Sequence, residues 1–230
     1  MIIEGIPYLS LRRNYAPSDE EVPAEEFQSR LKDCGRLKSI RGKLLEGEGT
    51  AGVADHRAWL LDGVHGGMIR DLLSHLFGPC YDAGFAGCEM MNLRVTLGYH
   101  ETGQPRGTFR PLKNPKEGET YAAIEGKFLT PYGTPDFKFE VGKYWTKHDR
   151  ELVMKFENGE ARLDYEKSFR FTIDELVEAT VTADFYPTLA FLDFKRFIEG
   201  KTHGHIGCAA AIVRFNETAR NAGLAQLGLV

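Results

Sequence analysis

The sequence feature that most constrains the fold is a clean amphipathic stretch that begins at Gly66. Its apolar residues recur at helical spacing and would form a single stripe: Met68, Ile69, Leu72, Leu73, Leu76 and Phe77. Such a stripe is typical of a helix that buries one side against a sheet. The pair Gly78-Pro79 follows the stripe and predicts the end of this helix.

Two residues that can perform chemistry stand directly before this helix. Asp62 and His65 are three positions apart, so we expect both side chains at or near the helix N-terminus, where the partial positive charge favours a carboxylate. A neutral histidine held in one orientation can act as a general acid or base. The same two residues would also serve as a helix cap beside a packed side chain. The sequence leaves both interpretations open.

Composition and charge narrow the class of protein. The 230 residues are 42% hydrophobic and 11% aromatic, which is ordinary for a soluble globular fold with one sizeable core. The net charge of -4 and the absence of a basic run give no general attraction to nucleic acid or anionic membranes. We therefore expect neither as a partner.

The cysteines indicate a reducing compartment. Cys34, Cys80, Cys88 and Cys208 show no zinc-ligand spacing, and no signal peptide or long apolar segment accompanies them. We expect a cytoplasmic protein with unpaired, mostly buried thiols and no metal site.

The first half of the chain mixes strands and helices. The pattern predicts an extended segment over 6–14, a helix over 24–33 that Gly35 ends, and strands over 37–46 and 87–98. The glycine- and proline-rich segment 100–119 has the composition of an excursion over the surface, either a lid beside a pocket or a surface insert.

The second half is mainly β. Strands are predicted over 122–129, 137–145, 151–157 and 160–165, with a type I′ turn at Asn158-Gly159, and helices over 183–199 and 206–221, ended by Gly200 and Gly223. The whole pattern predicts a single α+β domain over 1–230. Its core is an open, mostly antiparallel sheet of about six strands with helices packed on one face.

Two short motifs resemble ligand-binding motifs, but the residues around them favour other interpretations. Residues 47–52 satisfy G-x-G-x-x-G, but the strand before them is highly charged and no helical stripe follows, so they do not form the βαβ unit that binds dinucleotides. His203 and His205 lack a third ligand and are more typical of a polar linker.

Several segments resemble one known family. Leu-Leu-Asp-Gly-Val-His, followed by a helix ending in Leu-Phe-Gly-Pro, resembles the Asp-x-Gly-x-His helix in the C-terminal domain of the Gfo/Idh/MocA sugar oxidoreductases. That family usually has one more residue between the Asp and the Gly. Residues 209–223 resemble its terminal helix, which ends in Ser/Thr-Ala-x-x-x-Gly, and the strand, helix, strand opening resembles the start of the same domain.

The resemblance implies a substrate-binding domain of an NAD- or NADP-dependent sugar or polyol oxidoreductase. In this hypothesis His65 is the acid/base, Asp62 orients it, and Arg57, Arg94 and Lys127 contact the substrate. The Glu-Lys-Pro motif and the nicotinamide-binding glycines are missing from the sequence, so the cofactor would require a separate nucleotide-binding domain. The resemblance also implies that the free sheet face is partly apolar and buried in a homo-oligomer.

A second hypothesis needs no nucleotide. The chain could be a stand-alone ligand-binding or oligomerisation module, or an isomerase, lyase or cyclase that uses the pocket near His65. One histidine near one aspartate serves a binder and an enzyme equally well.

Overall fold

The computed structural model describes residues 2–3, 6–7, 13–14, 32, 34–47, 61–82, 89–130, 133–164, 170–173, 180–182, 184–185 and 206–230. All structural statements below refer to these residues. The predicted helix over 24–33 except Lys32, most of the helix predicted over 183–199, residues 48–52, and the residues Arg57, Cys88, His203 and His205 lie outside them.

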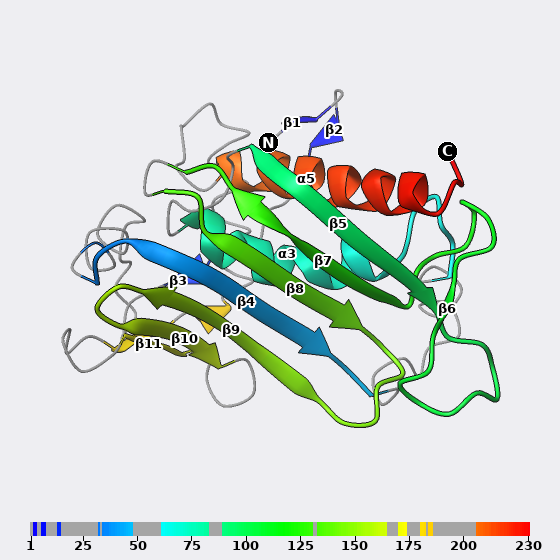
Figure 1. Ribbon diagram of the computed structural model, residues 1–230, viewed down its shortest axis with the longest axis horizontal. Coiled ribbons are helices and arrows are strands. Elements are labelled where there is room, and N and C mark those ends of the chain that lie inside the picture. Colours follow the sequence, from blue (N-terminus) through cyan, green and yellow to red (C-terminus); the bar gives the residue numbers. More distant parts are fainter. Residues whose placement is uncertain are drawn as a thin grey trace.

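A nine-stranded sheet forms the centre of the described structure, in the order β12-β11-β10-β9-β4-β8-β7-β5-β6 (Figure 1). All neighbouring strands in it pair antiparallel except β4 and β8, which are parallel. The bounds are β4 Leu37–Leu45, β5 Met90–Tyr99, β6 Arg110–Pro111, β7 Tyr121–Phe128, β8 Asp136–Gly142, β9 Asp149–Phe156, β10 Glu160–Asp164, β11 Arg170–Ile173 and β12 Thr180–Thr182. The predicted open, mostly antiparallel α+β sheet is confirmed, with more strands than expected.

Two pairs of short strands lie apart from this sheet. β1 (Ile2–Ile3) pairs with β2 (Ile6–Pro7), and β3 (Arg13–Asn14) pairs with β13 (Asp184–Phe185). The prediction that a helix starts at 183 is therefore wrong, because the backbone of Asp184–Phe185 pairs antiparallel with Arg13–Asn14.

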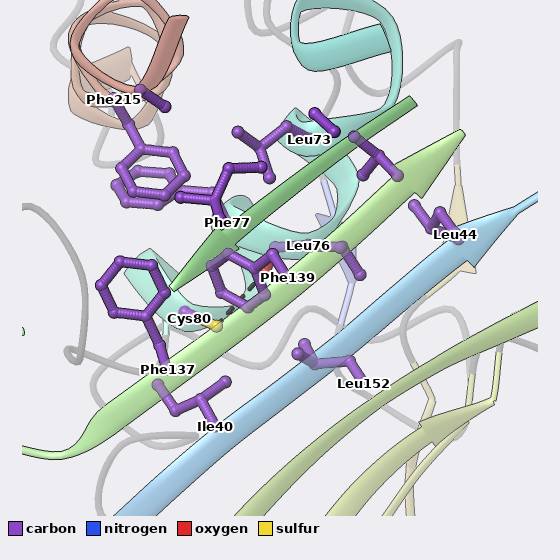
Figure 2. Close-up of a cluster of buried hydrophobic side chains, with 14 of the residues drawn as sticks. Ile40, Leu44, Leu73, Leu76, Phe77, Cys80, Phe137, Phe139, Leu152 and Phe215 are labelled. Carbon is purple, nitrogen blue, oxygen red and sulfur yellow. Dashed lines mark hydrogen bonds between the residues drawn. The ribbon is translucent and has the colours of Figure 1, made fainter. Parts of the chain in front are cut away.

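Two described helices, α3 (Met68–Asp82) and α5 (Ile206–Gln226), cover one face of the sheet (Figure 1). The predicted apolar stripe of α3 is buried: Leu73 and Leu76 are fully enclosed over β4 and β8 (Figure 2). The Phe77 ring stacks on Phe215 of α5 with ring centroids 4.2 Å apart. The core therefore lies between this helix pair and the sheet.

Both helices continue beyond the glycines that were predicted to end them. α3 passes through Gly78 and Pro79, and beyond them Cys80 is buried with its thiol donating to the Leu76 carbonyl at 3.2 Å. Burial of the next apolar residue thus outweighs the backbone hydrogen bond that proline removes. α5 passes through Gly223, where a Cβ would come within 2.9 Å of Leu97 and Val95. This glycine allows close packing on β5 and is not a helix stop.

The hairpin between β9 and β10 forms one residue earlier than predicted. Its backbone closes with the Phe156 N–H on the Gly159 carbonyl, and neither Asn158 nor Gly159 has the positive φ of a type I′ turn. The N–H groups of Glu157 and Asn158 instead donate to the carbonyls of Arg36 and Cys34. This pairing with the start of β4 fixes the turn.

The face of the sheet opposite the helices is charged. Lys138 of β8 lies beside Arg41 of β4 and pairs with Glu125 of β7, which also pairs with Arg94 of β5. The expected partly apolar face is confirmed only at one end, where Tyr121 of β7 stacks with Phe109 and Trp145. Along the middle of these strands the side chains that alternate with the buried ones are ionic. Among the described residues, no helix has the length and apolar character needed to cross a membrane.

Candidate functional site

The site is built on two backbone segments that run side by side before α3. Gly63 N–H donates to the Lys116 carbonyl and Gly118 N–H donates to the Leu61 carbonyl, both at 2.8 Å. The Met68 N–H then donates to the Glu119 carbonyl. The far end of the 100–119 segment is therefore buried against the start of α3, while most of its middle is exposed.

Asp62 and His65 contact each other in the turn before α3. One carboxylate oxygen of Asp62 accepts the Val64 N–H at 2.9 Å, and the other lies 2.8 Å from His65 Nδ1. These two hydrogen bonds lower the pKa of Asp62, the backbone one contributing most. An ionised carboxylate on Nδ1 fixes the proton there and leaves Nε2 as the acceptor.

The His65 ring is accessible. Its side chain is 73% exposed, and no described residue donates a hydrogen bond to Nε2. The arrangement can accept a proton from a ligand hydroxyl or donate one to a ligand oxygen. It brings the two predicted catalytic residues together, and their catalytic role stays a prediction.

Two glycines make this turn possible. A Cβ on Gly63 would lie 2.6 Å from the backbone of 115–117, and a Cβ on Gly67 would overlap the Glu119 carboxylate. Gly67 also has a φ of 97°, which residues with a side chain avoid. Glycine is thus required at positions 63 and 67 by the close approach of the 115–119 segment.

A buried ion pair supports the first turn of α3. The Glu119 carboxylate is fully buried, accepts the Ile69 N–H at 3.0 Å and contacts Arg220 Nε of α5 at 3.2 Å. Burial raises the pKa of Glu119, while Arg220 and the Ile69 N–H oppose that shift. Arg220 also donates to the carbonyls of Pro115 and Glu117. One guanidinium thus joins α5 to the 115–119 segment, and Glu119 extends this link to the first turn of α3.

Two further ion pairs flank the turn. Arg70 of α3 contacts Glu217 of α5 through Nε and Nη2, at 2.8 and 3.0 Å. Lys143, which follows β8 and is only 6% exposed, contacts Asp71 at 2.8 Å. The start of α3 is thereby tied to α5 on one side and to the end of β8 on the other.

The structure separates Arg94 and Lys127 from His65. Both line a hollow of about 670 Å³ on the charged face of the sheet, where Arg94 pairs with Glu125 and Lys127 with Asp136. Glu119 contacts the start of α3, and Lys127 lies eight residues further along, roughly 25 Å in an extended strand. A sugar beside His65 cannot reach Arg94 or Lys127 of the same chain.

The supporting residues Glu119, Arg70, Lys143 and Arg220 were not predicted from the sequence. Glu119 and Arg220 are 101 positions apart, and nothing in the local pattern marks Glu119 as buried. Arg220 alone carried a signal, because it lies within the apolar pattern of the terminal helix between Ala219 and Gly223.

Neither a metal-ligand cluster nor a glycine-rich βαβ turn occurs among the described residues. No cluster of three or more metal-binding side chains occurs in this part of the chain. Gly47 follows β4, a strand paired on both sides within this sheet, and no described βαβ unit continues from it.

No protein-family model matches the sequence, and no curated protein matches it either. Solved structures match the fold. A levoglucosan dehydrogenase in complex with NADH and levoglucosan aligns with a TM-score of 0.56 and 14% identity over 89% of this chain and 61% of its own. Myo-inositol 2-dehydrogenase from Lactobacillus plantarum aligns with a TM-score of 0.54 and 13% identity over 89% of this chain and 60% of its own.

A third match is a UDP-N-acetylglucosamine 3-dehydrogenase from Acidithiobacillus ferrooxidans, with a TM-score of 0.55 and 14% identity over 89% of this chain and 59% of its own. The chain thus spans about three fifths of these structures, a share consistent with one of their domains. Its fold is that of the C-terminal domain of the Gfo/Idh/MocA oxidoreductases.

Proposed function

On the basis of this fold, we propose that the chain is the substrate-binding domain of a sugar or polyol oxidoreductase. The observation that carries the proposal is the Asp62–His65 pair, with Nδ1 on the carboxylate and Nε2 open to solvent. In this role His65 takes the proton of a substrate hydroxyl on Nε2, and Asp62 stabilises the imidazolium that forms.

The nicotinamide cofactor must come from another domain. NAD or NADP would supply the hydride acceptor, and the described residues do not fit it, because no glycine-rich βαβ turn lies among them. The contribution of this chain is therefore to bind the substrate and to move one proton.

Substrate binding can be tested on the chain by itself. Levoglucosan, myo-inositol and UDP-N-acetylglucosamine are suitable probes because structurally similar dehydrogenases are named for them. We expect saturable binding of at least one in isothermal titration, weakened about tenfold or more in His65→Asn, as expected for the loss of a hydrogen bond worth about 1.5 kcal/mol or more.

His148→Asn is the matched control, since His148 is also an exposed histidine but follows β8. It should bind as the wild type does. Because His65 is exposed, His65→Ala should change the free energy of unfolding by less than about 1 kcal/mol. The proposal fails if no probe binds, or if His65→Asn binds as tightly as the control.

A second experiment separates the oxidoreductase from the enzyme without a cofactor. The probe that binds is incubated with the chain in deuterated water without nucleotide, and exchange at its carbon atoms is followed by NMR. The proposal predicts no exchange. Exchange that depends on His65 would overturn it in favour of an isomerase, lyase or cyclase.

A further inference from the structure

Arg70 donates hydrogen bonds to the backbone on both sides of His65. Its Nη1 donates to the carbonyls of Gly63 and Gly66, each at 3.2 Å. These two carbonyls bracket Val64 and His65, the two residues at the tip of the turn. The remaining donors, Nε and Nη2, bind both carboxylate oxygens of Glu217.

This geometry makes the guanidinium a rigid clamp. A two-pronged contact with a carboxylate fixes the plane of the guanidinium, so the direction of Nη1 is set by Glu217 of α5. The Arg70 side chain is only 20% exposed, which limits competition from water. The positions of the Gly63 and Gly66 carbonyls therefore depend on α5, whose Glu217 lies 147 residues beyond Arg70 in the chain.

We propose that Arg70, held by Glu217, is the positioning residue for the Asp62–His65 pair. The Gly66 N–H already closes the turn onto the Asp62 carbonyl at 2.8 Å, and the Arg70 contacts prevent the peptide groups of Gly63 and Gly66 from rotating. Without them the turn can open, and His65 Nδ1 loses the fixed carboxylate that keeps its proton there. The catalytic meaning of this positioning rests on the proposed function.

The tautomer of His65 reports the positioning directly. Ring nitrogen shifts in the full chain, measured by NMR at a pH where the ring is neutral, distinguish a proton on Nδ1 from one on Nε2. We expect Nδ1–H to dominate in the wild type and to lose its majority in Arg70→Met. Arg70→Lys should show the same loss, because an ammonium keeps the charge but cannot form the fork.

Two further variants test the role of Glu217 and provide a control. Glu217→Gln keeps the packing of α5 and weakens the fork, so it should shift the tautomer ratio in the same direction but less. Arg36→Met removes a more exposed arginine–glutamate pair, with Glu157, directly before β4 and should leave His65 as in the wild type. If Arg70→Met is unfolded, Arg70→Lys and Glu217→Gln carry the test.

The proposal is overturned if folded Arg70 variants keep the wild-type tautomer, or if Arg36→Met changes it as much. This readout uses no substrate. A shifted tautomer together with sugar binding that is indifferent to His65→Asn would reject the proposed function and leave the positioning role intact.

Discussion

At the scale of the residue, the site depends on two glycines that are close to Asp62 and His65 in the sequence. It also depends on charged residues that come from distant parts of the chain. Gly63 and Gly67 allow the turn to approach 115–119, and the buried Glu119 carboxylate occupies the space that a side chain on Gly67 would need. Asp62 and His65 were predicted to be neighbours at a helix start, and their contact is confirmed.

Gly67→Ala should therefore destabilise the protein for two reasons, a positive φ and an overlap with Glu119. We expect a loss of about 3 kcal/mol or more in the free energy of unfolding, measured with urea. Gly103→Ala is the control, since Gly103 has a similar φ of 89° with open space around it, and should cost only about 1–2 kcal/mol. Equal losses in the two variants would show that the Glu119 contact adds nothing.

At the scale of the element, buried packing determines where the helices end. α3 continues to Asp82 through Gly78 and Pro79, and α5 continues to Gln226 through Gly223. Gly223 is required because Leu97 and Val95 of β5 occupy the position of its missing Cβ.

Gly223→Ala tests this packing. Alanine favours the helix by about 1 kcal/mol, but an added methyl in a filled core costs about 1–3 kcal/mol. We expect a lower melting temperature, and we expect the double variant Gly223→Ala, Leu97→Ala to lose less stability than the sum of the two single variants. A Gly223→Ala protein that melts at or above the wild-type temperature would contradict the close packing of α5 on β5.

At the scale of the whole molecule, the two faces of the sheet are chemically opposite. The face toward α3 and α5 is apolar. The other carries ion pairs between β5, β7 and β8 and between β4 and β9, with the Phe109–Tyr121–Trp145 stack at one end. A homo-oligomer through this second face, which the family resemblance implied, stays a prediction, and its contacts would include these ion-paired side chains.

Sedimentation velocity at low and high salt tests that prediction. Since raising the salt from 0.1 to 1 M shortens the screening length from about 10 to about 3 Å, we expect an oligomer that weakens with salt. Lys138→Glu should weaken it further, whereas Lys116→Glu, in the exposed part of 100–119, should not. A monomer under all conditions would remove the interface and leave the fold unchanged.

The sequence by itself determined the elements whose patterns are local. The alternation of Phe137, Phe139 and Val141 and the stripe of α3 report which side is buried, because a side chain's burial follows the period of its own strand or helix. From these patterns came the strands β4, β5 and β7 to β10, the helix at 68, the α+β class and the adjacency of Asp62 and His65.

Only the tertiary structure decided the relations between distant segments. The parallel pairing of β4 with β8, the Glu119–Arg220 pair and the Arg70–Glu217 clamp each join residues about a hundred or more positions apart. The sheet likewise placed Arg94 and Lys127 on the face opposite α3, far from His65. Such contacts depend on which elements pack together, and that choice is made by burial over the whole core, which no local period records.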